Sequence, residues 1–201
     1  MDITTVEQLE ELYGTPQPGP LRKEVARLTP EYQAVIEASP FFALATAGPE
    51  GLDCSPRGDA AGFVRVVGPG TLQFPDRRGN NRLDSLRNIV RDPRVALLFL
   101  IPGIGETLRV NGTARLIRDP QLAARFEVRG TLPALVIEVA VGSVYYQCPK
   151  AVVRSRLWDP DRFVGHDAVP TAGQIMAGIT DEVDAQAFDA AYPGRMQATL
   201  Y

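Results

Sequence analysis

The feature that most restricts what this chain can fold into is a series of short apolar segments in its middle, joined by tight turns. Strands are predicted at residues 41–47, through Asp53 and Ser55, and at residues 62–67, 71–74, 94–101, 107–116 and 135–141. Glycine and proline mark the turns between them, as in Gly68-Pro69-Gly70. Strands joined this closely pair antiparallel, because a parallel pair needs a crossover of about a dozen residues or more. The pattern therefore predicts an antiparallel barrel rather than a parallel βαβ sheet.

The alternation of apolar and polar residues predicts which strand faces are buried. It is clearest at residues 107–116, where one face would carry Leu108, Val110, Ala114 and Leu116. Residues 94–101 are apolar almost throughout, which predicts a strand buried on both faces. At residues 62–67 the alternation would place Phe63 and Val64 on opposite sides of one strand.

Helices are expected at both ends of this β region. Residues 6–13 are amphipathic, and three prolines break that helix between residues 14 and 20. A second helix is predicted from Thr29 to Ala38, with Thr29 as its N-cap. Shorter helices are predicted at about 120–128, 174–177 and 184–190. We expect a single domain, residues 1–201, made of an N-terminal helical extension (1–40), the barrel (41–159) and a C-terminal extension (160–201).

Composition argues against several classes of function. The net charge of −3 gives no basic field for nucleic acid or an anionic membrane, and the longest apolar stretch is too short to span a bilayer. Two cysteines without a CxxC pair, and a start without signal-peptide features, predict a cytoplasmic protein. His166 is the only histidine, and no residues have metal-ligand spacing, so no metal site is predicted. Any chemistry is therefore expected to belong to an organic cofactor.

The segment from Phe74 to Val90 carries the strongest functional signal. It is typical of a strand end, a polar glycine loop and a helix. Asn81 is expected to be the N-cap of that helix, with Asp84 at the capping-box position. Its apolar stripe, which we expect to be buried, consists of Leu83, Leu86 and Val90.

A phosphate site is one interpretation of this loop. The N-terminus of a helix offers free backbone N–H groups and the positive end of the helix dipole. Side-chain donors around it would be Asn80, Asn81, Arg82 and one or both of Arg77 and Arg78. The alternative is that Asn81 only caps the helix and the arginines are solvated.

Several short motifs follow one another in a set order between Phe41 and Asp159. They are Ser55-Pro56-Arg57-Gly58-Asp59, Gly62-Phe63-Val64, Phe74-Pro75-Asp76-Arg77, Gly79-Asn80-Asn81-Arg82, Asp92-Pro93-Arg94-Val95 and Thr107-Leu108-Arg109-Val110-Asn111-Gly112. This order resembles the pyridoxamine 5′-phosphate oxidase-related FMN-binding family, and within it an uncharacterised FMN-dependent branch. The resemblance implies a mainly β (α+β) fold: a split β-barrel, antiparallel and Greek-key-like, with short flanking helices. It also implies a homodimer that holds FMN at the subunit interface and acts on a small-molecule substrate.

The resemblance also assigns roles to particular residues. Residues 80–82 match the loop that binds the flavin phosphate, and Arg57 matches a strand arginine near that phosphate. Thr107 and Arg109 match polar residues near the flavin of the neighbouring subunit. Together, the candidate cofactor-binding residues are Arg57, Pro75, Asp76, Arg77, Asn80, Asn81, Arg82, Thr107, Arg109, Lys150 and Arg154.

Lys150 and Arg154 belong to a helix expected after Pro149, which would place both on one face. A solvated basic face is the alternative, but the branch that the chain resembles commonly has a Cys-Pro-Lys-Ala helix near the flavin. True pyridoxamine phosphate oxidases engage the vitamin phosphate through an Arg-Leu-His segment. The nearest string here is Arg156-Leu157-Trp158, which argues against oxidation of pyridoxamine phosphate.

The leading hypothesis is an FMN-dependent oxidoreductase, for which no catalytic residue is identified. A non-catalytic FMN-binding protein, either a carrier or a sensor, is the alternative from a different class. A third reading keeps the split barrel and exchanges the ligand for F420 or haem. Haem is disfavoured because the only histidine, His166, lies outside the barrel segment.

Overall fold

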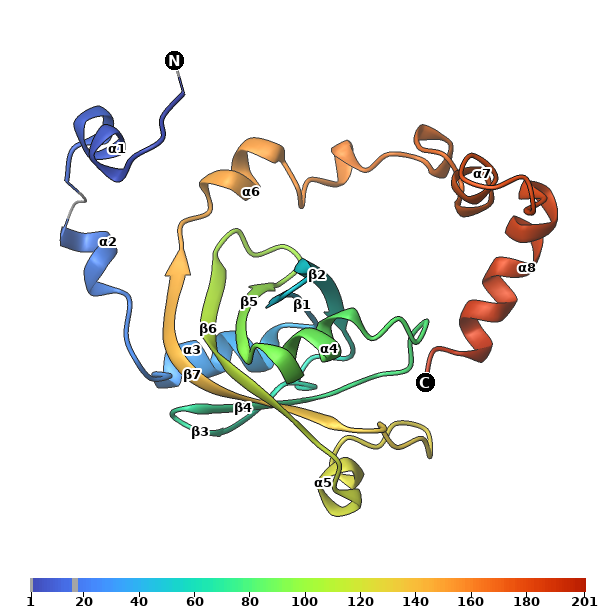
Figure 1. Cartoon of the computed structure of the whole chain (residues 1–201), viewed down its shortest axis with the longest axis horizontal. Coiled ribbons are helices and arrows are strands. Elements are labelled where there is room, and N and C mark those ends of the chain that lie inside the picture. Colours follow the sequence, from blue (N-terminus) through green and yellow to red (C-terminus); the bar gives the residue numbers. More distant parts are fainter. Residues whose placement is uncertain (1, 16–17) are drawn as a thin grey trace.

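The computed structural model describes residues 2–15 and 18–201. Within them the chain forms one antiparallel, seven-stranded sheet that curls into a barrel (Figure 1). The strands are β1 (Phe41–Gly48), β2 (Gly51–Gly58), β3 (Arg65–Gly68), β4 (Thr71–Pro75), β5 (Arg94–Leu100), β6 (Thr107–Ile117) and β7 (Val136–Gln147). Their order is β2-β1-β5-β6-β7-β4-β3, and each neighbouring pair is antiparallel. The predicted antiparallel barrel is confirmed.

The barrel is split, because its edge strands β2 and β3 do not pair with each other in the described chain. Tight hairpins join β1 to β2 and β3 to β4, and β5, β6 and β7 follow one another as neighbours. The connection from β4 to β5 contains α4 (Asp84–Arg91), which packs against β1, β2 and β6. The expected split-barrel α+β architecture is therefore the one observed.

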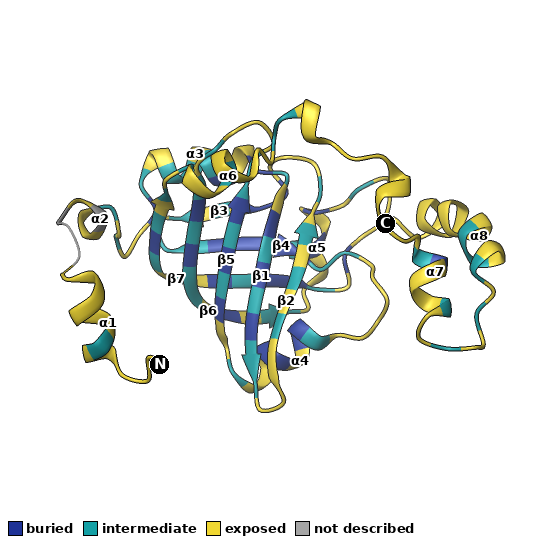
Figure 2. Ribbon diagram, turned by 90° about the horizontal axis from the view of Figure 1, so that it is seen from above, coloured by how far each residue is buried: buried dark blue, intermediate teal, exposed yellow. Residues whose placement is uncertain are grey.

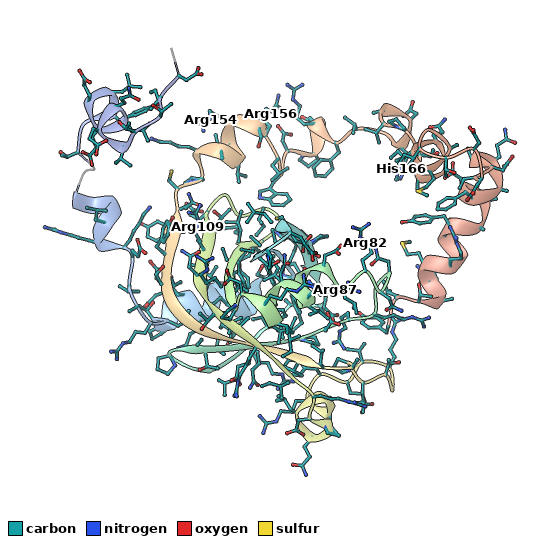
Figure 3. All side chains as sticks on the ribbon, viewed as in Figure 1. Arg82, Arg87, Arg109, Arg154, Arg156 and His166 are labelled. Atoms are coloured by element: carbon teal, nitrogen blue, oxygen red, sulfur yellow. The ribbon has the colours of Figure 1, made fainter. Side chains whose placement is uncertain are left out.

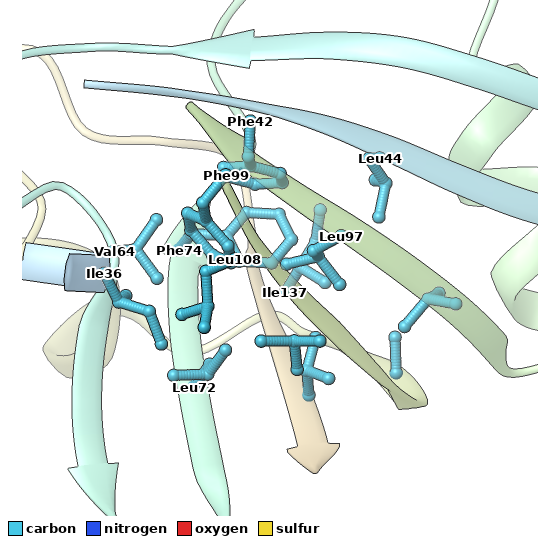
Figure 4. Close-up of a cluster of buried hydrophobic side chains, with 14 of the residues drawn as sticks. Ile36, Phe42, Leu44, Val64, Leu72, Phe74, Leu97, Phe99, Leu108 and Ile137 are labelled. Atoms are coloured by element: carbon cyan, nitrogen blue, oxygen red, sulfur yellow. The ribbon is translucent and has the colours of Figure 1, made fainter. Parts of the chain in front are cut away.

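Phenylalanine rings lie among the aliphatic side chains that fill the centre of the barrel (Figure 4). Phe42 of β1 is fully buried, and its ring centroid lies 4.9 Å from that of Phe74 on β4 and 5.1 Å from that of Phe99 on β5. Phe63, which precedes β3, stacks on Phe42 at 5.7 Å. Since β4 and β1 are not neighbours in the sheet, these rings hold the two sides of the split barrel together.

The central strands bury one face and leave the other partly exposed. On β6 the core-facing residues are those that the alternation predicted, Leu108, Val110, Ala114 and Leu116. The expectation that residues 94–101 are buried on both faces is wrong. Along β5, buried residues alternate with the half-exposed Ala96, Leu98 and Leu100 (Figure 2). The second apolar face of β5 lies on the outside of the barrel, where the pattern of apolar residues alone could not distinguish it from a second core face.

A bulge in β7 changes which of its residues face the core. The pairing with β6 shifts at Gly112, so that Gly142 has no partner in the ladder. As a result Val139 and Val144, at an odd and an even position, are both fully buried. Close approach of the strands requires a glycine at position 112, because a Cβ there would lie 2.1 Å from the carbonyl oxygen of Ala140.

We expect Gly112→Ala to lower the free energy of unfolding by about 1–3 kcal/mol, the range found for overfilled sites. The obstructing atom belongs to the backbone, so no side-chain rotation relieves the contact. Gly70→Ala is the matched control, since a Cβ at that position meets no atom within 4 Å. Urea denaturation of both variants measures the difference, and equal stabilities would contradict the account of the bulge.

Short helices flank the barrel. They are α1 (Val6–Tyr13), α2 (Pro18–Arg22), α3 (Pro30–Ala38), α5 (Pro120–Ala124), α6 (Lys150–Ser155), α7 (Ala172–Ala177) and α8 (Ala185–Ala198), with 3₁₀ turns η1 (Pro160–Arg162) and η2 (His166–Ala168). The helices at 6–13 and 30–38 are confirmed, and Thr29 caps α3 by accepting a hydrogen bond from the N–H of Tyr32 at 3.3 Å. None of the helices in the two described ranges is long and apolar enough to cross a membrane.

The break predicted at 14–20 is confirmed: α1 ends at Tyr13 with Gly14 as its C-cap, and the separate helix α2 begins at Pro18; residues 16 and 17 lie outside the described residues. Two local expectations are wrong. The strand predicted at 62–67 begins only at Arg65, since Gly62 (φ 86°) turns the chain, and Phe63 and Val64 are both buried. The last helix extends well past residue 190, through Pro193 to Ala198, and the described contacts do not explain why it continues through the proline.

Candidate functional site

A cleft of about 1060 Å³ opens where the barrel is split. Its walls come from β2 at Arg57, the end of β4, the loop 76–83 with the start of α4, and residues 131–135. Leu200 and Tyr201, from the segment after α8, complete the lining. Sites for small molecules occupy roughly 300–1,000 Å³, so the cleft has room for a molecule of cofactor size.

The loop before α4 contains two residues in the left-handed backbone region, Asn81 (φ 60°) and Leu83 (φ 63°). Leu83 occupies the N-cap position, and no side chain caps the helix there. The prediction that Asn81 and Asp84 form the cap is therefore wrong. Asn80 turns the loop instead, by accepting a hydrogen bond from the N–H of Arg82 at 3.1 Å. A left-handed leucine costs about 1–2 kcal/mol, and strain of this kind is concentrated at functional loops.

The late start of α4 turns a different face toward the barrel. The buried positions are Ser85, Leu86, Asn88 and Ile89. Leu86 is the only member of the predicted stripe among them, since Leu83 and Val90 are exposed. The stripe was misplaced because half of the buried face is polar, and apolar spacing carries no signal for polar residues.

Those two polar side chains fasten α4 to the sheet. Asn88 donates to the hydroxyl of Thr46 on β1 at 3.1 Å, and Ser85 donates to the carboxylate of Asp53 on β2 at 2.6 Å. Asn88 also lies close against β1, because a Cβ at Gly48 would meet its Oδ1 at 2.1 Å. The loop at one end of the cleft is thus held by buried hydrogen bonds to β1 and β2.

Two largely buried ion pairs cross the cleft wall. Nη1 of Arg57 lies 2.8 Å from Oδ1 of Asp76, and both side chains are 17% exposed. Nε of Arg77 lies 2.7 Å from Oδ2 of Asp59, whose side chain is only 4% exposed. The two pairs thus connect the end of β2 to residues 76 and 77, which follow β4.

Asp59 is the centre of a group of donors. It accepts hydrogen bonds from the N–H of Ala60 at 2.7 Å, from Arg77 at 2.7 Å and from the phenol of Tyr201 at 2.9 Å. Burial raises the pKa of the Asp59 carboxyl, but these hydrogen bonds outweigh burial and hold the pKa below its usual value. Arg77 also donates to the carbonyl oxygen of Phe126 at 2.7 Å, so its guanidinium is fixed at two points.

The outer part of the loop carries more accessible cations. Arg82 pairs with Asp84 at 2.8 Å, but the two side chains are 73% and 45% exposed. Arg78 is exposed and makes no ion pair in the described chain. An anionic ligand could therefore recruit Arg78 and Arg82 without breaking a buried interaction.

Arg57 has one unsatisfied donor. Its Nε is buried and has no hydrogen-bond acceptor among the described residues, although the residue lines the cleft. A buried donor without a partner costs about 1–3 kcal/mol, so such groups are rare in folded proteins. Arg57 is thus a charged residue of the cleft wall whose hydrogen bonding is incomplete within the described chain.

The buried and exposed ion pairs should differ in their effect on stability. We expect Arg77→Ala to lower the free energy of unfolding by about 3–5 kcal/mol, because it leaves the Asp59 carboxylate buried without its cation. Arg82→Ala should change it by about 1 kcal/mol or less. Urea denaturation of the two variants measures both values, and similar losses would contradict the assigned burial.

The structure brings most of the predicted site residues together. Those that line the cleft are Arg57, Pro75, Asp76, Arg77, Asn80, Asn81 and Arg82. Arg109 and Thr107 lie elsewhere, on the outer side of β6; Arg109 donates to Gln147 at 3.1 Å and lies over the ring of Tyr145. Figure 3 shows Arg109 well apart from Arg82.

Lys150 and Arg154 also lie outside the cleft. Both are exposed on α6, which follows β7 beyond the barrel (Figure 3). Within the described ranges, no group of three or more histidine, cysteine, aspartate or glutamate side chains is arranged to hold a metal ion.

Sequence reasoning missed several residues of the site. They are Asp53, Asp59, Phe63, Ser85, residues 131–135, Leu200 and Tyr201. Asp59 and Phe63 stood inside motifs that were already of interest, so their order in the chain could have indicated them. Tyr201 carried no signal, because its contact with Asp59 joins residues 142 positions apart.

One family model matches the chain. It is described as pyridoxamine 5′-phosphate oxidase and matches residues 28–148, which include β1 to β7. No curated protein matches the chain.

Three solved structures are among those similar to the chain. HupZ from Group A Streptococcus is 16% identical, with a TM-score of 0.49, over 60% of this chain and 94% of that chain. A candidate pyridoxamine 5′-phosphate oxidase from Lactobacillus delbrueckii is 22% identical, with a TM-score of 0.46, over 60% and 99%. General Stress Protein 26 from Bacillus anthracis is 16% identical, with a TM-score of 0.43, over 56% and 88%.

Proposed function

The chain belongs to the pyridoxamine 5′-phosphate oxidase family, and we propose that it binds FMN in the cleft and acts as an oxidoreductase on a small organic substrate. The observation that carries this proposal is the buried Nε of Arg57, a cationic donor without an acceptor in the wall of a cleft of cofactor size. The exposed cations of the neighbouring loop, Arg78 and Arg82, support it.

The lining of the cleft has the two kinds of surface that FMN needs. FMN joins a phosphate to a flat and largely apolar ring system. Donors for the phosphate are available at Arg78 and residues 80–82, and apolar contacts for the ring at Phe63, Pro75, Leu86, Leu132 and Leu135. Bound FMN would supply the hydride and electron transfer. The residues of the chain would bind the phosphate, orient the ring and keep water from its apolar faces.

A homodimer is the second part of the proposal, and the outer face of the sheet supports it. Ala43, Leu98, Arg109 and Tyr145 form one row across four strands, on the side opposite the core. At the edge of this face Leu52 is 89% exposed. A sheet face with so many apolar side chains is typical of an interface. Arg109 lies on this face, so the role that the resemblance implies for it, near the flavin of the neighbouring subunit, requires such a dimer.

A non-catalytic FMN-binding protein is the competing function, and the state of the cleft carboxylates favours it. Asp76 and Asp84 are paired with arginines, and Asp53 accepts a hydrogen bond from Ser85. None of these carboxylates is left free to act as a general acid or base. Catalysis would therefore depend on the flavin itself, with the protein supplying position and electrostatics.

The first test measures binding of FMN by the purified chain, with quenching of flavin fluorescence as the signal. We expect saturable binding, and Arg57→Ala should raise the dissociation constant at least about tenfold, or about 1.4 kcal/mol, because it removes a buried charged donor. Arg94→Ala is the control, since Arg94 is an exposed arginine paired with Asp92 outside the cleft. No binding by the wild-type chain, or equal effects of the two variants, would contradict the proposal.

The complex of the chain with FMN also distinguishes an oxidoreductase from a non-catalytic FMN-binding protein. A reduced nicotinamide added without oxygen should bleach the flavin band near ~450 nm if the protein is an oxidoreductase of this kind. Bound FMN that stays oxidised with reduced nicotinamides and does not turn over would favour the carrier or sensor.

The dimer is tested by a charge placed on the outer face. We expect sedimentation velocity to give twice the mass of the chain for the wild type and the mass of one chain for Leu98→Glu, because the glutamate would be desolvated in the interface. Val67→Glu, a similar change at an exposed site on β3, should remain dimeric. Circular dichroism checks that both variants fold, and a monomeric wild type would overturn this part.

A further inference from the structure

The segment after α6 leaves the barrel and returns to it. Figure 1 shows it arching away through α7 and α8, with its end near the loop beside α4. We call residues 159–201 the strap. Its base is fixed by Trp158, whose indole N–H donates to the carbonyl oxygen of Ile104 at 2.8 Å.

The strap holds itself together rather than holding on to the barrel. α7 and α8 pack on each other, and Asp189 of α8 accepts hydrogen bonds from the hydroxyl of Thr171 and the N–H of Gly173. Within the described chain, no hydrogen bond or ion pair joins residues 159–200 to the barrel. A unit with so few bonds to its surroundings can separate from them without unfolding the rest of the protein.

Tyr201 is where the strap meets the barrel again. Its phenol donates to Asp59 at 2.9 Å, and its ring centroid lies 5.5 Å from the guanidinium carbon of Arg77 and 5.4 Å from that of Arg129. The ring is therefore held by a hydrogen bond to a buried carboxylate and by two cation–π contacts. With Leu200 it forms part of the lining of the cleft.

We propose that Tyr201 is the gate residue of the cleft: release of its phenol from Asp59 lets the strap swing open to admit or release a ligand. The gate is a positioning device and takes no part in bond making. Its hydrogen bond to Asp59 and its stacking on Arg77 and Arg129 are contacts within the chain, so they hold the gate shut without help from a ligand. The identity of the ligand as FMN rests on the proposed function. The hydrogen bond between Tyr201 and Asp59, which we call the clasp, is independent of that function.

This arrangement predicts an uncommon pair of rate changes. Removal of a residue that only contacts the bound ligand speeds dissociation of the ligand and leaves the association rate unchanged. Loss of the clasp should increase the open population before and after binding. Both rates should therefore rise together, with little change in affinity.

Stopped-flow mixing with FMN as the probe measures both rates. For Tyr201→Ala we expect association and dissociation to rise at least about fivefold, with a dissociation constant within about threefold of the wild type. Tyr201→Phe keeps the ring and loses the hydrogen bond, so its two rates should lie between those of the wild type and those of Tyr201→Ala. Tyr13→Ala, at an exposed tyrosine of α1, should match the wild type. A rise in dissociation alone, or no change in either rate, would overturn the gate.

A second measurement needs no ligand. The ring carbon that bears the Tyr201 hydroxyl can be followed by NMR, assigned with Tyr201→Phe. The hydrogen bond to Asp59 raises the pKa of the Tyr201 phenol, and Asp59→Asn should return it toward that of a free tyrosine. If Tyr201 titrates like a free tyrosine in the wild type, the clasp does not exist and the proposal fails. If the wild type binds no FMN, the proposed function fails, and this titration still decides whether the clasp exists.

Discussion

The packing of Phe42 against Phe74 ties the two sides of the split barrel together. Phe42 pairs with Arg57 in the β1–β2 ladder, and Phe74 lies two residues before Asp76. The edge-to-face contact of the two rings at 4.9 Å therefore fixes the distance between β2 and the end of β4. The ion pair of Arg57 and Asp76 at 2.8 Å spans the same two strands. The core and the cleft are thus built from adjacent positions of the same segments.

The cleft is electrostatically almost balanced, and this decides what it could bind. Arg57 and Arg77 are neutralised by buried aspartates, so these two pairs act as parts of the wall. The donors that remain are the unpaired Nε of Arg57, the exposed guanidinium of Arg78 and the guanidinium of Arg82, whose pair with Asp84 is exposed. A ligand with one compact anionic group and a large neutral part fits this distribution better than a polyanion does.

The family match ends at residue 148, before the strap begins. It covers residues 28–148, whereas the strap and its contact with Asp59 lie beyond. The barrel and the loop before α4 are thus shared with the family model, whereas the Tyr201 side of the contact lies outside it. The outer face of β5, on which the proposed homodimer rests, lies within the match.

Most strands and their antiparallel pairing could be predicted from the residues alone, because alternation and turns are local properties of the chain. Residues 80–82, which the motifs mark as a candidate ligand loop, line the cleft. Tertiary packing fixed the start of α4, which is anchored through the buried polar residues Ser85 and Asn88. It also decided that the second face of β5 is external and that Tyr201 reaches Asp59. Each of these depends on partners distant in the chain, for which apolar spacing holds no information.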